Sequence, residues 1–203
     1  MKPSLLFAFD LESVLVPELW KEVALKYEVE ELVRTTRDGL SVDSLYRRRA
    51  EICRNRKLKV SDIIEVAEEL ALLAGAEIVL NWCQSQGQVI VVTDALGELM
   101  HPVYTLLEGV SIWDHHALVD DEGFFTGWRR GYEKGKASVI QKAQKDNKYV
   151  IAIGDSDNDL AMLRAADRGV LFNSTYTMTG VKNVSDHEEL LRYLKANADS
   201  NQE

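Results

Sequence analysis

Residues 149–163 read YVIAIGDSDNDLAML: a largely apolar run, a polar hexapeptide and the start of a helix-like pattern. The run at 149–153 indicates a buried strand, so the carboxylates of Asp155, Asp157 and Asp159 follow a strand end. In parallel α/β sheets, ligands bind outside the carboxyl ends of the strands, and crowded anionic oxygens there are costly unless a hard cation neutralises them. This stretch therefore predicts an α/β sheet with a Mg²⁺ site at its carboxyl edge.

The hexapeptide has two other interpretations. Asp and Asn also cluster in turns and helix caps, and Asp157 could be the N-cap of the helix that follows. The spacing also matches a calcium loop, but that loop requires Gly and a bidentate Glu where this chain has Leu160 and Ala166. The calcium loop is therefore disfavoured.

Length and composition limit the class of protein. The chain of 203 residues can form one domain or a domain with an inserted subdomain, and its formal net charge of -9 disfavours a nucleic-acid partner. No apolar stretch approaches the roughly 20 residues of a membrane span, and no signal peptide is visible. Cys53 and Cys83 lack a CxxC or histidine neighbourhood, which favours buried thiols. We expect a cytoplasmic monomer or homodimer without a membrane partner.

The rest of the chain repeats the alternation of strand and helix. Strand-like runs occur at 5–9, ending at Asp10, and at 88–92, ending at Thr93 and Asp94, with a shorter one at 169–172. Helix-like patterns separate the strands, at 76–85, 98–107, 137–145 and 160–166. The fold class predicted is α/β, a doubly wound, Rossmann-like parallel sheet.

The first two strands are separated by some 75 residues, far more than one crossover helix needs. Helix-like segments within this interval lie at 18–27, 29–34, 45–57 and 61–73. We therefore predict an inserted helical cap at 16–74, with the catalytic core at 1–15 and 75–203. A second interruption, at 110–132, has the pattern of a hairpin, and the tail from Asn197 has the composition of a disordered segment.

The groups at the strand ends suit phosphoryl transfer. Asp10 can attack phosphorus to give an aspartyl-phosphate, and Glu12, on the same side of an extended chain, can act as general acid and then base. Thr93 and Lys136 can hold the transferring phosphoryl oxygens. Asp10 and Asp155 would share Mg²⁺, together with the backbone carbonyl of Glu12.

This ordered set resembles the haloacid dehalogenase superfamily of phosphatases, in which DxD, Ser or Thr, Lys and GDxxxD follow one another along the chain. The finer resemblance is to phosphoserine phosphatases with a small helical cap. DLESVLVPELW at 10–20 and TTRD at 35–38 are similar to the variant that is both phosphoserine phosphatase and homoserine phosphotransferase. The resemblance implies Mg²⁺-dependent hydrolysis of O-phospho-L-serine in serine biosynthesis, with transfer to homoserine in that variant.

The resemblance also implies residue roles. Glu18 and Arg49 match the positions that grip the amino and carboxylate groups of a small phosphorylated amino acid, although Arg47 and Arg48 compete for the arginine role. Asp94 would line the substrate pocket.

The resemblance also implies residues that support the site from the second layer, and it leaves two candidates for the site lysine. Asn158 and Asp159 would support the metal and the lysine from behind. Helical phase favours Lys136 as that lysine, because 139, 140 and 143 then face the sheet, while Lys134 before Gly135 also resembles some relatives.

Glu12 is one methylene longer than the usual Asp, and Ser13-Val14 replaces the usual Gly-Thr. The longer Glu12 favours capture of the phosphoryl group by an acceptor other than water, and Ser13-Val14 removes the Thr hydroxyl. The alternatives kept open are a phosphatase for another small phosphomonoester, such as the methionine-salvage enol phosphate, and a non-catalytic binding protein. The four histidines, His101, His115, His116 and His187, are expected to have no part in the site.

Overall fold

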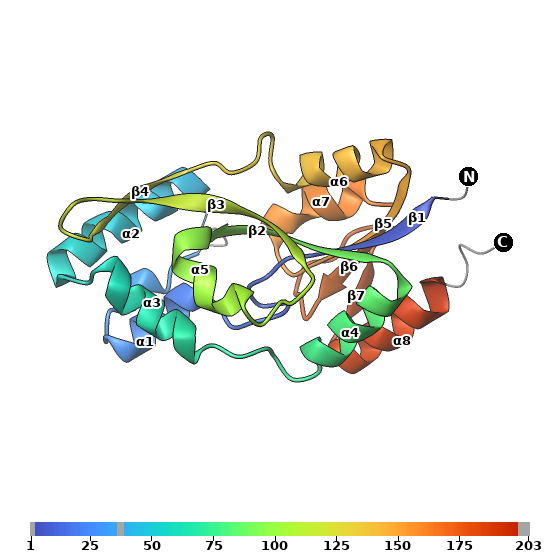
Figure 1. Ribbon diagram of the computed structural model, residues 1–203, viewed down its shortest axis with the longest axis horizontal. Helices are drawn as coiled ribbons and strands as arrows, with labels where there is room; N and C mark the ends of the chain where they lie inside the picture. Colours follow the sequence, from blue (N-terminus) through green and yellow to red (C-terminus); the bar gives the residue numbers. More distant parts are fainter. Residues whose placement is uncertain (1–2, 36–38, 199–203) are drawn as a thin grey trace.

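The computed structural model describes residues 3–35 and 39–198, and over these residues seven strands form one sheet (Figure 1). The order across the sheet is β4-β3-β2-β1-β5-β6-β7, and every neighbouring pair is parallel except the antiparallel β3 and β4. The strands are Ser4–Phe9 (β1), Gln88–Leu96 (β2), Ser111–Val119 (β3), Phe125–Arg129 (β4), Lys148–Gly154 (β5), Arg168–Phe172 (β6) and Lys182–Val184 (β7).

Helices cover both faces of the sheet because its central strands are apolar on both sides. In β1, Phe7 and Phe9 belong to one buried cluster, whereas Leu6 and Ala8 belong to another. The first face packs against α4 (Ala76–Gln86), α5 (Gly97–Tyr104) and α8 (His187–Ala198), and the second packs against α6 (Lys136–Lys145) and α7 (Leu160–Ala165). The predicted doubly wound α/β fold is confirmed.

Between β1 and α4 the chain forms a group of helices at one end of the molecule (Figure 1). These are α1 (Leu19–Lys26), a 3₁₀ turn at Glu30–Leu32, α2 (Val42–Arg56) and α3 (Val60–Glu69). Its exit from β1 and return before α4 place this group beside the carboxyl ends of β1 and β2. The cap predicted at 16–74 covers this helical group, and its role as a cap stays a prediction.

The β3–β4 hairpin extends from the sheet to this helical group, where β4 packs against α2 (Figure 1). At the hairpin tip, the Val60 N–H donates to the Gly123 carbonyl at 2.9 Å, and Arg54 forms ion pairs with Asp120 and Glu122. The hairpin predicted at 110–132 is therefore present, and it joins the sheet to the helices.

Several expectations need correction. The sequence reading missed β7 and α8, and α8 continues through Ala198, so the start of the tail predicted as disordered is helical. Residues 199–203 of that tail, and Thr36, Arg37 and Asp38 of the quoted TTRD stretch, lie outside the described residues. Cys53 and Cys83 are buried free thiols, as predicted. Among the helices that the structure describes, none is both long and apolar enough to span a membrane.

Candidate active site

One buried ammonium lies among three carboxylates where the strands end. Lys136 is the first residue of α6, and its Nζ lies 2.7 Å from Asp159 Oδ1, 2.9 Å from Asp10 Oδ1 and 3.6 Å from Asp94 Oδ2. Burial lowers the pKa of Lys136, but these carboxylates outweigh burial and hold that pKa well above its usual range. The lysine is therefore charged and pairs with carboxylates near the carboxyl ends of three different strands, β1, β2 and β5. Lys134, the alternative, is exposed.

The carboxylates outnumber this cation. Oxygen atoms of Asp10, Asp155 and Asp159 lie within 4.8 Å of one another, and all three side chains are buried. Burial, and next the charge of Asp159, raise the pKa of Asp10 well above its usual range, although Lys136 opposes the shift. A buried cluster of carboxylate oxygens with excess negative charge is the donor set that Mg²⁺ prefers, so these residues fit the predicted ion.

Asp159 organises the loop that carries this cluster. Its Oδ2 accepts the backbone N–H of Asp155 at 3.0 Å and of Ser156 at 3.2 Å, while Oδ1 accepts Lys136. Gly154 makes this possible, because a Cβ there would lie 2.5 Å from the Asp159 Cβ. The N-cap of α7 is Asp159 and that of the short 3₁₀ helix at Asp157–Asp159 is Ser156, so the interpretation of Asp157 as the N-cap of the following helix was wrong.

Asp94 contacts both Lys136 and Asn158. Its Oδ2 accepts a hydrogen bond from Asn158 Nδ2 at 2.8 Å. Burial raises the pKa of Asp94, but Lys136, His115 and Asn158 outweigh burial and hold that pKa well below its usual range. Thr93, the preceding residue, is buried beside them.

Glu12 lies in the same pocket as Asp10, and its carboxyl group could donate a proton there. Its Oε1 accepts the backbone N–H of Leu19 at 2.8 Å. Burial raises the pKa of Glu12, because the hydrogen bond from Leu19 and the charge of Arg49 offset desolvation only in part. A carboxyl group with a raised pKa keeps its proton for a leaving group at a higher pH.

The other end of the pocket is formed by helices α1 and α2. The Arg49 guanidinium lies 4.7 Å from the Trp20 ring centroid and 5.4 Å from that of Tyr46. Its NH2 donates to the Arg34 carbonyl at 3.1 Å, and its buried Nε has no hydrogen-bond partner among the described residues. The guanidinium is therefore fixed in position and retains donor capacity for a ligand.

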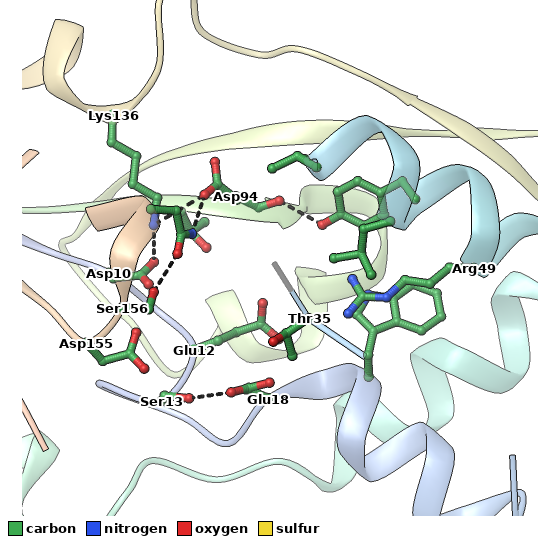
Figure 2. A pocket seen from close by; sticks show the side chains of 16 residues that line it. Asp10, Glu12, Ser13, Glu18, Thr35, Arg49, Asp94, Lys136, Asp155 and Ser156 are labelled. Atoms are coloured by element: carbon green, nitrogen blue, oxygen red, sulfur yellow. Dashed lines mark hydrogen bonds and ion pairs between the residues drawn. The ribbon is translucent and has the colours of Figure 1, made fainter. Parts of the chain in front are cut away.

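The neighbouring arginines and Glu18 differ in placement. Arg47 pairs with Asp43 on the surface and Arg48 is exposed, so neither reaches the pocket. The Glu18 Oε1 accepts Ser13 Oγ and Lys21 Nζ, both at 2.9 Å. Figure 2 shows Arg49 at one end of the pocket and Lys136 at the other.

All nine predicted site residues line this single pocket, which opens to solvent. The predicted members are Asp10, Glu12, Glu18, Arg49, Thr93, Asp94, Lys136, Asp155 and Asn158. The sequence reading missed the remaining lining residues, Ser13, Trp20, Thr35, Val42, Leu45, Tyr46 and Ser156. The amphipathic pattern of α1 and α2 could have indicated that their apolar residues are buried. It could not have indicated which of these residues face the pocket.

One histidine also belongs to the site region. His115 on β3 is buried, with Nε2 at 3.5 Å from Asp94 Oδ1. None of the four histidines lines the pocket, but strand pairing brings β3 beside the end of β2 and so places His115 against Asp94. His187 is structural, with Nε2 at 2.8 Å from the Val14 carbonyl.

Comparisons with known proteins agree with this geometry. The model of the haloacid dehalogenase-like hydrolases matches residues 7–164. The phosphoserine phosphatase ThrH of Pseudomonas aeruginosa is 37% identical over 167 residues, which cover 81% of this chain and 80% of that protein. The phosphoserine phosphatase of Pseudomonas syringae pv. tomato is 33% identical over 165 residues, covering 81% and 70% respectively.

A solved structure shows the same fold. The phosphoserine phosphatase from T. onnurineus, in complex with NDSB-201, aligns with a TM-score of 0.75 at 21% identity, covering 96% of this chain and 95% of that chain.

Proposed function

The chain belongs to the haloacid dehalogenase-like hydrolase family, and on that premise we propose that it hydrolyses O-phospho-L-serine through an aspartyl-phosphate intermediate. The observation that carries the proposal is one pocket with a phosphate-binding end and an amino-acid-binding end. The carboxylates and Lys136 form the first end, and Arg49 and Glu18 form the second. The two relatives named phosphoserine phosphatase support this substrate.

In the first step, a carboxylate oxygen of Asp10 attacks phosphorus, and the bond from phosphorus to the serine oxygen breaks. Glu12 donates its proton to that oxygen, so serine leaves neutral at its hydroxyl. In the second step, ionised Glu12 takes a proton from water, whose oxygen attacks phosphorus and displaces Asp10. Lys136 and the Thr93 hydroxyl hold the phosphoryl oxygens during both steps.

Asp10 and Asp155, together with the backbone carbonyl of Glu12, would hold Mg²⁺. When bound, the ion supplies positive charge that compensates the phosphoryl oxygens and the crowded carboxylates. Asp159 is already engaged by Lys136 and two backbone N–H groups, so its part is to support the loop.

The substrate's charged ends would be recognised by the cap. The carboxylate of phosphoserine would accept hydrogen bonds from Arg49, and its ammonium would pair with Glu18. We also propose that residues 16–74 form the cap subdomain that covers the site and excludes water.

Transfer to homoserine is a second candidate, and the apolar wall of the pocket favours it. Trp20, Val42, Leu45 and Tyr46 line the pocket and offer an apolar surface against which an acceptor molecule could pack. An amino-acid acceptor bound by the same Arg49 and Glu18 would bring its hydroxyl to the position that water takes in hydrolysis. Glu12 would then deprotonate this hydroxyl.

The experiment is phosphate release from O-phospho-L-serine with Mg²⁺ and with EDTA, with homoserine added in parallel. We expect metal-dependent release that Asp10→Asn abolishes, and phosphohomoserine as a second product if transfer occurs. Release from an aryl phosphate but not from phosphoserine would reject the substrate and favour another small phosphomonoester. The absence of release from both would favour a non-catalytic binding protein.

A further inference from the structure

The Asp94 carboxylate is held by two groups that the proposed chemistry does not use. His115 Nε2 lies 3.5 Å from Asp94 Oδ1, and the Tyr132 hydroxyl lies 3.3 Å from the same oxygen. The Tyr132 hydroxyl also donates to the Thr93 carbonyl at 3.0 Å. Both side chains belong to the hairpin region, with His115 on β3 and Tyr132 just after β4.

The hydrogen bonds of His115 define its tautomer. The backbone N–H of Gly131 donates to His115 Nδ1 at 3.2 Å. A backbone N–H can only donate, so Nδ1 must be the unprotonated acceptor and the neutral ring carries its hydrogen on Nε2. Nε2 is the ring nitrogen that lies 3.5 Å from Asp94 Oδ1.

The other oxygen of Asp94 serves the pocket. Asp94 Oδ2 accepts Asn158 Nδ2 at 2.8 Å and lies 3.6 Å from Lys136 Nζ. Because His115 and Tyr132 lie against Oδ1, rotation of the carboxylate is restrained and Oδ2 stays beside Asn158 and Lys136. A carboxylate free to rotate would draw Lys136 toward itself and away from Asp10.

We propose that His115 is a positioning residue for phosphoryl transfer: from the β3–β4 hairpin it orients Asp94, which in turn sets the place of Lys136 and Asn158. This role rests on the proposed function, because it gives Lys136 the task of holding phosphoryl oxygens. Under this proposal, the β3–β4 hairpin contributes to the reaction by orienting Asp94, in addition to contacting the helical group.

A purely packing role is the competing explanation. The His115 ring is stacked on Tyr132, with centroids 4.5 Å apart and an interplanar angle of 27°, and it lies 5.0 Å from the Trp128 ring. A packing role depends on the shape of the His115 ring and does not depend on which ring nitrogen donates a hydrogen bond. The two explanations therefore predict different results for variants that keep one nitrogen's function and remove the other.

Such a pair is His115→Gln and His115→Asn. Glutamine places an N–H donor near the position of Nε2, whereas asparagine places an acceptor near Nδ1 and loses the donor to Asp94. We expect His115→Gln to keep most of the activity, and His115→Asn to lower kcat about 10-fold with little change in KM. The matched control is His116→Gln, on the neighbouring exposed histidine. Equal losses in the Gln and Asn variants, or no loss in either, would overturn the proposal.

Two measurements keep the test decisive if an Asn or Gln variant does not fold. Tyr132→Phe keeps the stacked ring and removes the hydroxyl that contacts Asp94 Oδ1 and the Thr93 carbonyl, so we expect it to lower kcat several-fold, whereas a pure packing role of the rings predicts unchanged kcat. In the wild-type protein, ¹⁵N chemical shifts of His115 should show the tautomer protonated at Nε2, and the Nδ1 tautomer would contradict the assigned contact.

Both kinetic comparisons are run on O-phospho-L-serine and on an aryl phosphate. Wild-type turnover of the aryl phosphate alone would reject the proposed substrate and still test His115. If neither substrate is turned over, the tautomer measurement decides, because it needs no activity.

Discussion

The two ends of the pocket are built in different ways. At the phosphate end, charged groups at the carboxyl ends of β1, β2 and β5 bond to one another, with Lys136 shared by three carboxylates. At the cap end, Arg49 is held mainly by aromatic rings and one carbonyl. The core thus supplies a tightly coupled charge network, and the helical group supplies Arg49 and Glu18, each held by its own partners. We therefore expect variants at the phosphate end to lose turnover of every substrate. Variants at the cap end should lose turnover of phosphoserine only.

The largest difference is expected for Lys136→Met, with Lys134→Met as its matched control. Loss of the ammonium leaves buried carboxylates unpaired, so we expect about 3–5 kcal/mol of lost stability in EDTA. Activity should disappear on phosphoserine and on an aryl phosphate alike. Urea unfolding and phosphate release measure the two effects. An inactive Lys134→Met beside an active Lys136→Met would reverse the assignment of the lysine.

Mg²⁺ should stabilise the phosphate end. At an ion concentration 100 times its Kd, binding adds about 2.7 kcal/mol to the free energy of unfolding. Burial and neighbouring carboxylates raise the pKa of Asp10, so without metal its contribution to stability is lost as pH rises through that pKa. Mg²⁺ binds the ionised form, and the thermal shift should therefore be larger at pH 8 than at pH 5.

Asp155→Asn is the control for this measurement, because it removes one proposed ligand. The Mg²⁺ shift should be lost in that variant, while a variant at the cap end, Arg49→Lys, should keep it. A shift that persists in Asp155→Asn would place the ion elsewhere.

At the cap end, Arg49→Ala should lower kcat/KM for phosphoserine about 30-fold, the loss of roughly 2 kcal/mol from one charge-assisted contact. Turnover of an aryl phosphate, which lacks the carboxylate, should change little. Arg48→Ala, next along α2 and exposed, should resemble the wild type on both substrates. Equal losses for Arg49→Ala on both substrates would mean that this arginine does not select the amino acid.

The smallest effect concerns the hairpin tip. Arg54 pairs with Asp120 and Glu122 at the surface, and exposed ion pairs contribute little. We expect Arg54→Ala to reduce the free energy of unfolding by less than about 1 kcal/mol at low salt, and by less still at high salt. A larger loss in thermal or urea unfolding would mean that the tip contact is part of the cap's core.

Much of the core and of the phosphate end could be predicted from sequence because both follow local rules. Apolar runs give β1, β2 and β5, and reactive residues come directly after them. α8 could have been found as well, because Leu190 and Leu194 have helical spacing and are buried. β7 has three residues, too few for a periodic signal.

The role of His115 could not be predicted in that way. It depends on the register of β3 beside β2 and on Gly131 returning to the ring, and neither leaves a pattern near residue 115. The choice of Arg49 among three consecutive arginines likewise needed the orientation of α2, which only tertiary packing determines.

Gly154 carries no functional group, yet the site depends on it. Any side chain there would displace Asp159, and with it the hold on Lys136 and on the loop of Asp155. One codon change at this position could thus silence the enzyme while every motif carboxylate remained. In a related sequence, the presence of glycine at this position is therefore as informative about retained activity as the presence of the proposed nucleophile, Asp10.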